Sequence, residues 1–181
     1  MKKLNKKGFT LIELLAVIVI LAILVAVAIP AVTRYLNTAR EGTYADNAQA
    51  AISVVRNDVI STFGAASSKA YGLNTGACYD TVNDKVLTDK TTEAACTAVN
   101  NAVWNDTTIN EMLEKKLKTS PYGADYDNTS YVLVKLNPAD GSYTYSICLT
   151  DGTRGISANE DVIATTGVTN FEECPKPAAA Q

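Results

Sequence analysis

"KKGFTLIELL", residues 6–15, joins a basic cluster to a long apolar run and decides how the rest of the chain is organised. Glu13 is the only charged residue between Lys7 and Arg34. Residues 14–33 carry no charge and are rich in Leu, Ile, Val and Ala, and roughly 20 such residues can cross a bilayer as a helix. A carboxylate beside such a run is costly unless it has a partner, so Glu13 needs an explanation.

The charge of the 181-residue chain is unevenly distributed. Four lysines lie among the first seven residues with no acid beside them, whereas 12 basic and 19 acidic residues follow. Positive charge just before an apolar run holds that end in the cytoplasm and sends the rest outward. The acidic remainder offers no general attraction to nucleic acid, and we expect Lys115, Lys116 and Lys118 to form a solvated helix face.

Four cysteines all follow the apolar run, on the side that we expect to be exported. An even number of cysteines in an exported domain favours two disulfides, and the absence of histidine and of CxxC pairs argues against structural zinc. Of the three possible pairings we favour Cys78–Cys96 and Cys148–Cys174, because each closes a modest local loop. In the chain-entropy model such loops contribute about 3 kcal/mol each.

Three interpretations of the N-terminal segment are open. A cleaved secretory signal peptide fits the basic and apolar regions and "AVA" at 26–28, although the uncharged run continues to Thr33. A permanent single-pass anchor fits the length and the orientation but gives Glu13 no role. Cleavage between Gly8 and Phe9 would instead remove the leader lysines and create a new α-amino group on Phe9, four residues before Glu13.

The third interpretation gives the Glu13 carboxylate a partner. Residues four apart share a helix face, so the Phe9 amine of the same chain would lie within reach. The Phe9 amine of a neighbouring chain is the alternative partner, in a bundle of identical helices. In that arrangement each Glu13 would select the register of its neighbour.

The residues "KKGFTLIELLAVIVILAILVAVAIP" resemble the N-terminal signature of type IV pilins and their relatives, over about residues 6–40. The resemblance implies that a prepilin peptidase cuts after Gly8 and that the new N-terminus at Phe9 is methylated. It also implies that Glu13 pairs with the N-terminus of an adjacent subunit during assembly.

Two positions within the helix are also compared with the family. The resemblance implies that Pro30 is the proline that kinks the helix in pilins. Many pilins carry a glycine near Ala22, in the stretch that unwinds in the filament, so the alanine here makes unwinding between Ala22 and Pro30 less certain.

We therefore expect an α+β chain similar to the pilin fold. A long helix from about Phe9 to Phe63, transmembrane in its first half, would pack on a small antiparallel sheet with disulfide-closed loops. The expected divisions are a leader at 1–8, a transmembrane or filament-core half of the helix at 9–33, an amphipathic half at 34–63, and a soluble head at 64–181. The apolar stripe of the amphipathic half has helical spacing and consists of Ala48, Ile52, Val55, Val59 and Phe63.

The head has its own local signals. Thr108 and Glu111 fit a capping box that opens a helix over 106–117, and a "PADG" turn separates strands at 130–137 and 142–150. The remaining expectations are a loop at 63–80, a short helix within 91–104, a third strand at 161–166 and a disordered tail at 175–181.

The sequence lacks the usual residues of catalysis. Without histidine there is no Ser-His-Asp or Cys-His arrangement, and no phosphate-binding glycine motif occurs. Asp125 and Asp127 suggest calcium only weakly, and a solvated loop is the simpler interpretation. We expect neither an enzyme nor a cofactor or metal.

The function expected from the resemblance is structural. The chain would be a single-pass membrane precursor that becomes a subunit of an extracellular pilus for adhesion, twitching motility, aggregation or DNA uptake. Its partners would be further copies of itself, the prepilin peptidase, the assembly machinery and the inner or cytoplasmic membrane, with nucleic acid bound only through a pilus role. A pseudopilin of a type II secretion or competence system and a secreted or anchored binding domain are the alternatives.

Overall fold

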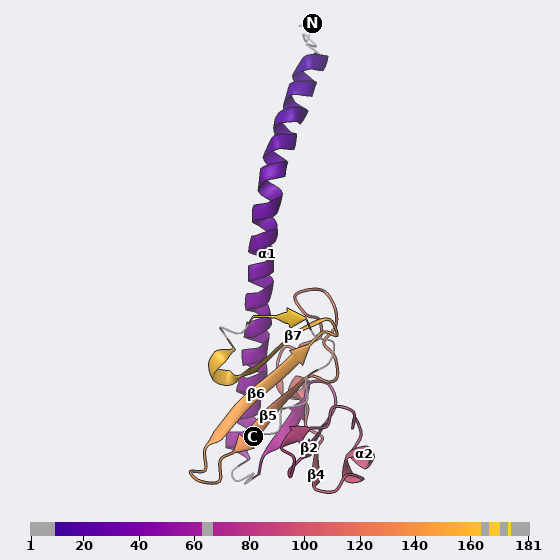
Figure 1. The fold of residues 1–181 in the computed structure, drawn as a ribbon, viewed down its shortest axis with the longest axis vertical. Helices are drawn as coiled ribbons and strands as arrows, with labels where there is room; N and C mark the ends of the chain where they lie inside the picture. Colours follow the sequence, from indigo (N-terminus) through magenta and orange to yellow (C-terminus); the bar gives the residue numbers. More distant parts are fainter. Residues whose placement is uncertain (1–9, 63–66, 164–166, 171–173, 175–181) are drawn as a thin grey trace, which may run out of the picture. The chain divides into compact units, whose positions relative to one another are not determined.

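The computed structural model describes residues 10–62, 67–163, 167–170 and 174 of the chain. The chain divides into two compact units, Met1–Ala39 and Arg40–Gln181. Helix α1 (Leu11–Ser61) continues through the boundary between them (Figure 1). The chain is α+β, with a long apolar N-terminal helix, an antiparallel sheet and two disulfides, as expected.

The two ends of α1 differ in their surroundings. Its apolar window has a mean hydropathy of 3.2 and none of it is buried, so by length and composition α1 can cross a membrane. From Tyr44 onward, one stripe of the same helix is buried in the core of the Arg40–Gln181 unit. Four of the five predicted stripe residues are confirmed, and Phe63 lies outside the described residues. The buried positions are Tyr44, Ala48, Ala51, Ile52, Val55 and Val59.

The main sheet has five antiparallel strands in the order β1-β5-β6-β7-β8. Its centre is the predicted hairpin, which is confirmed because Leu136 pairs with Tyr143 and Tyr131 with Cys148. Alternate residues of the hairpin strands, such as Val132 and Ile147, face the buried stripe of α1. The strands are β1 (Lys69–Gly72), β5 (Tyr131–Leu136), β6 (Tyr143–Thr150), β7 (Arg154–Asn159) and β8 (Thr169–Asn170).

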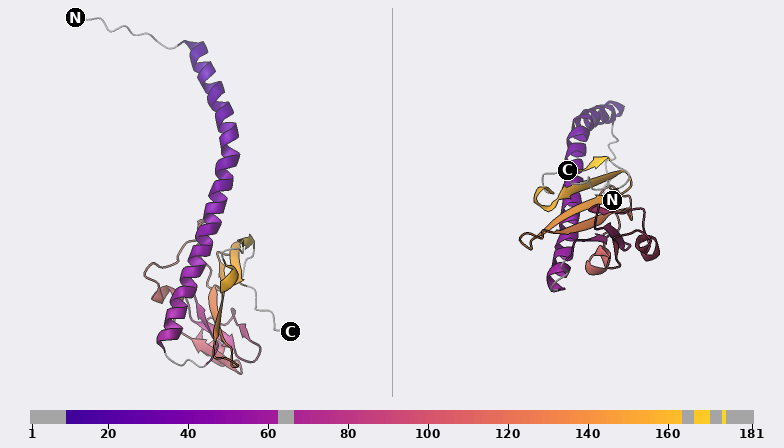
Figure 2. Two further views of the ribbon diagram at one scale, coloured as in Figure 1. Left: turned by 90° about the vertical axis from the view of Figure 1, so that its left-hand side faces the viewer. Right: turned by 60° about the horizontal axis from the view of Figure 1, so that its bottom comes forward.

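The opposite face of the hairpin is also covered. A second sheet of three short strands has the order β3-β2-β4, comprising β2 (Ala77–Asp80), β3 (Lys85–Val86) and β4 (Ala102–Asn105) (Figures 1 and 2). Tyr79 of β2 and Leu133 of β5 belong to one buried cluster. Cys148 and Thr150, which alternate along β6 with the residues that face α1, are therefore buried as well.

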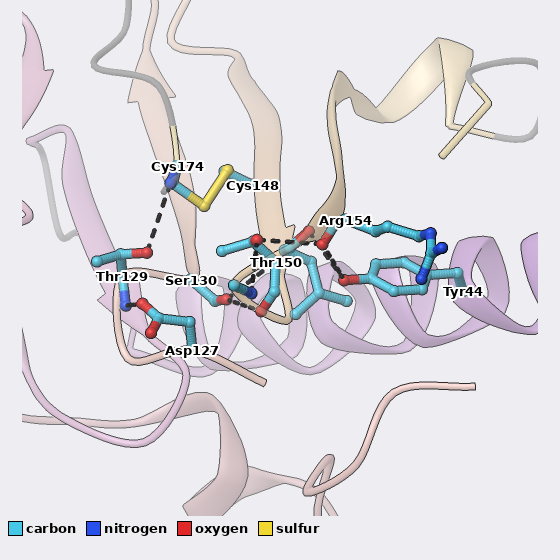
Figure 3. Close-up of a disulfide and its surroundings, with 10 residues drawn as sticks. Tyr44, Asp127, Thr129, Ser130, Cys148, Thr150, Arg154 and Cys174 are labelled. Atoms are coloured by element: carbon cyan, nitrogen blue, oxygen red, sulfur yellow. Dashed lines mark hydrogen bonds between the residues drawn. A yellow bond between two sulfur atoms is a disulfide. The ribbon is translucent and has the colours of Figure 1, made fainter. Parts of the chain in front are cut away.

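The disulfides have the pairing favoured from the sequence. Cys78–Cys96 joins β2 to helix α2 (Glu93–Thr97), whose N-cap is Thr92. Cys148–Cys174 attaches the chain after β8 to the middle of the main sheet (Figure 3). The backbone N–H of Cys174 also donates to Oγ1 of Thr129, 3.4 Å away.

Several local predictions were wrong. Residues 69–72 and 77–80 are strands rather than loop, because they pair with β5 and β4. The short helix within 91–104 is confined to α2, and 102–105 form β4 instead. The strand expected at 161–166 is replaced at Glu160–Val162 by a 3₁₀ helix, η1, while residues 164–166 lie outside the described part.

The helix expected at 106–117 is much shorter, although its start is confirmed. Thr108 and Glu111 form the predicted capping box, but α3 covers only Ile109–Met112. The backbone then turns extended at Leu113. The Asn110 side chain holds the following segment, since it accepts from the N–H of Leu117 and donates to its carbonyl, at 2.7 and 3.0 Å. Lys115, Lys116 and Lys118 are therefore exposed on an irregular segment and not on a helix face.

Candidate functional site: the start of α1 and its apolar surface

The Glu13 carboxylate has a partner within its own chain. Oε2 of Glu13 accepts from the backbone N–H and from Oγ1 of Thr10, at 2.8 and 2.7 Å. The backbone N–H of Glu13 points back toward Oγ1 of Thr10 at 3.3 Å. Thr10 precedes the first helical residue, so the two side chains form a reciprocal capping box at the start of α1.

Thr10 is a functional residue that was not predicted from the sequence. The signal was present, because "TLIE" at 10–13 matches the Ser/Thr-x-x-Glu pattern that opens a helix before an apolar run. A carboxylate in the first turn is also favoured by the helix dipole. Helix α1 consequently begins at Leu11, two residues later than predicted, and Thr10 is its cap.

The apolar side chains that follow have no cover among the described residues. Every large hydrophobic residue from Leu11 to Leu36 is exposed, with fractions between 46% at Leu36 and 82% at Leu11. They surround the helix on all sides, and Glu13 is the only charged residue between Lys7 and Arg34. A soluble monomer rarely exposes an apolar surface of this extent, so this segment requires lipid or other helices around it.

Helix α1 is continuous through Pro30 and through the stretch that begins at Ala22. Proline supplies no backbone N–H, so the carbonyl of Ala26 lacks the donor that position 30 normally provides. One turn later, Oγ1 of Thr33 donates to the carbonyl of Ile29 at 2.9 Å. The predicted cleavage and methylation positions, Gly8 and Phe9, lie outside the described residues.

The candidate calcium ligands and the cysteines of the described part of the head have structural partners. No group of three His, Cys, Asp or Glu side chains is placed to hold a metal ion there, and all four cysteines are in disulfides. Asp125 and Asp127 instead accept local hydrogen bonds, from Oγ1 of Thr119 and the N–H of Thr129. Burial raises the pKa of the Tyr131 hydroxyl to about 12, further above physiological pH than its ordinary value of about 10.

One comparison with known proteins identifies the N-terminal segment. The model of the prokaryotic N-terminal methylation motif matches residues 3–29. The chain carries the class III signal peptide of type IV pilins. Neither the curated proteins nor the solved structures yielded a match to the chain.

The methylation motif narrows the function class. It supports a type IV pilin-like or pseudopilin precursor and thus favours a structural role for the chain. It implies processing by a prepilin peptidase and assembly into a filament. Together with the exposed apolar helix, the motif fits a membrane-anchored precursor.

Proposed function

We propose that this chain is a structural subunit of a type IV pilus, cut after Gly8 and polymerised through its N-terminal helices into a surface filament. One observation carries the proposal: the methylation motif at 3–29 coincides with a helix whose apolar surface is exposed on every side. In the precursor, lipid covers that surface, and in the filament, the helices of other copies cover it. The filament would serve adhesion, twitching motility, aggregation or DNA uptake.

The capping box gives Glu13 a stage-dependent role in this proposal. In the precursor, Thr10 supplies hydrogen bonds that partly compensate the charge at the membrane boundary. Both of these bonds end on Oε2, and a carboxylate has a second oxygen with further acceptor sites. After cleavage, that oxygen would pair with the methylated Phe9 amine of a neighbouring copy and fix its register.

The charge of Glu13 and its capping function can be separated by substitution. Glutamine at the third helical position still completes a capping box, but it carries no charge. We expect Glu13→Gln to be processed normally and to form almost no filaments on cells, because the ammonium of a neighbour would have no counterion. Thr10→Ala keeps the charge and removes the cap, so it should assemble with only a modest loss.

Cryo-imaging of filaments sheared from cells, together with immunoblots for the cleaved chain, measures both steps. Filaments at wild-type levels from Glu13→Gln, with loss in Thr10→Ala, would show that Glu13 acts only as a cap. Recovery of the wild-type chain as a soluble monomer, without residues 1–28, would refute the pilus proposal itself.

A pseudopilin is the second candidate, because the motif fits it equally well. Two disulfides and a Thr- and Asn-rich head favour a subunit that is exposed outside the cell. Deletion of the gene decides between the two. We expect long surface filaments to disappear, whereas loss of protein secretion with surface filaments intact would indicate a pseudopilin.

A further inference from the structure

A second surface feature lies in the Arg40–Gln181 unit, outside the segment with the proposed assembly role. Two exposed arginines from distant parts of the chain lie over one tyrosine ring. Cζ of Arg154 is 4.6 Å from the ring centroid of Tyr122, and Cζ of Arg40 is 5.7 Å from it. Both distances are within the range of cation–π attraction, roughly 6 Å, so Tyr122 gathers two positive charges at one place.

The core holds this cluster in position. The ring of Tyr122 packs against that of the fully buried Tyr44, with centroids 6.4 Å apart. The hydroxyl of Tyr44 donates to the carbonyl of Arg154 at 3.1 Å (Figure 3). Arg40 lies one helical turn before Tyr44 on α1. The buried Tyr44 therefore fixes the backbone of both arginines: Arg154 through this hydrogen bond, and Arg40 because it belongs to the same helix.

Neither arginine has a carboxylate partner in the described part of the chain. The ion pairs found there involve Arg56, Lys90 and Lys135. The nearby Asp151 carboxylate is occupied differently, since it accepts from the backbone N–H of Arg154 and from the hydroxyl of Ser120. When the planar guanidinium of an arginine stacks on an aromatic ring, the N–H groups along the guanidinium edge remain able to donate to an oxygen ligand. Two such groups together suit an external anion with several oxygens, such as phosphate.

The position of Arg40 along α1 indicates which anion is nearby. Residues 14–33 rise by about 30 Å in a helix, the thickness of the hydrocarbon core. Arg40 follows Thr33 by only seven residues, about 10 Å of helix, so the chain keeps it close to the headgroups. Arg34 and Tyr35, directly after the apolar run, are residue types that anchor helices at this interface.

We propose that Arg40, Tyr122 and Arg154 form a docking surface for the phosphate groups of anionic lipids in the outward-facing leaflet. The surface holds the head of the unassembled chain against the membrane in which it is anchored. The proposal depends on membrane anchoring and not on filament formation. Near an anionic surface each basic residue contributes about fivefold to binding, so removing both arginines should shift the docking equilibrium of the head by more than tenfold.

Headgroup quenching of a fluorophore beside the cluster tests this in the full-length chain. Ala124→Cys, in the exposed loop after Tyr122, carries the label, and vesicles of phosphatidylcholine with or without phosphatidylglycerol carry a quencher on the headgroup. We expect strong quenching only with phosphatidylglycerol. We expect that quenching to fall to the phosphatidylcholine level in Arg40→Gln/Arg154→Gln, and to persist in Lys115→Gln/Lys116→Gln, which loses the same charge elsewhere. Arg40→Gln alone, at an exposed helix position, should give an intermediate value and serves if the double variant misfolds.

Three outcomes would overturn the proposal. Quenching that does not depend on phosphatidylglycerol would exclude a role for anionic lipid. An equal loss in the lysine variant would mean that only net charge matters. Binding of a DNA duplex to the wild-type chain in phosphatidylcholine vesicles, abolished in the arginine variant, would assign the surface to nucleic acid instead.

Discussion

The two ends of α1 show how differently one helix can be used. Up to Leu36 its large apolar residues are all exposed, and its first turn carries the capping box of Thr10 and Glu13. From Tyr44 to Val59 it is the central element of a buried core. The exposed region has few packing contacts among the described residues, so lipid or other helices must account for its apolar sequence. The buried region is constrained by packing in the head, so mutations there should change the stability of the head and leave filament assembly unaffected.

The largest contrast is expected from matched isoleucines of α1. Ile52→Ala, at a position with 1% exposure, should lower the free energy of unfolding of the head by about 3 to 4 kcal/mol, because it leaves a cavity. Ile20→Ala, at 58% exposure, should change it by less than about 0.5 kcal/mol. Denaturant unfolding of the full chain in detergent measures both. Equal effects at the two positions would contradict the division of the helix.

The disulfide of the main sheet should give the next largest effect. Cys148 and Cys174 are 26 residues apart in sequence, and replacing both by serine should cost about 3 kcal/mol. The chain segment with β7 and β8 should lose its protection first, because the bond attaches its far end to β6. Amide hydrogen exchange locates the effect. Unchanged exchange in β7 would show that strand pairing alone holds the segment.

Acid should weaken the head through Asp151. Burial alone would raise the pKa of this carboxyl, but hydrogen bonds from Ser120, Arg154 and Thr153 outweigh it, and the pKa lies below its ordinary value. The resulting stability is therefore present above the unfolded pKa, about 3.9, and is lost as the pH falls below it. Asp151→Asn should lose about 1 to 2 kcal/mol at neutral pH and show a smaller loss on acidification. Thermal unfolding between neutral and acid pH checks the slope, and the same slope in both proteins would exclude Asp151 as its source.

The smallest effects come from the two capping boxes, which have the same Thr-x-x-Glu pattern in different surroundings. Thr108→Ala in the head should cost about 1 kcal/mol of unfolding free energy, because the N–H of Glu111 loses its acceptor. Thr10→Ala should leave that quantity unchanged, since its helix end contributes nothing to the core. Parallel urea titrations of the two variants compare them directly. A destabilised head in Thr10→Ala would mean that the start of α1 supports the core.

The sequence predicted most successfully where a signal was long or local. The helical period of α1 runs over many turns, and the hairpin of β5 and β6 has a turn with Pro138 and Gly141 between two apolar runs. The capping box at Thr108 was also predicted from four residues. Such signals depend on residues close together in the sequence, so they can be recognised without knowledge of the tertiary contacts.

The predictions that were wrong concern segments whose structure depends on contacts with residues further along the chain. Strand β1 pairs with β5, more than fifty residues later, and its glycine-rich surroundings look like a loop. Gly76, within the predicted loop at 63–80, is required because a Cβ there would come within 2.2 Å of the Trp104 ring. The early end of α3 follows from the bonds between Asn110 and Leu117, which no helical pattern reveals. The candidate site differs, because its Thr-x-x-Glu pattern at residues 10–13 is local. The prediction included Glu13 but not Thr10, since a carboxylate beside an apolar run first suggests a charged partner.

The N-terminal residue of the chain in purified filaments tests the central claim most directly. Mass spectrometry of the N-terminal peptide should find Phe9 with one added methyl group, from a chain that lacks residues 1–8. A mature chain that begins at Ile29 would be the product of an ordinary signal peptide, and one that begins at Met1 would be an unprocessed anchor. Either result would contradict the account.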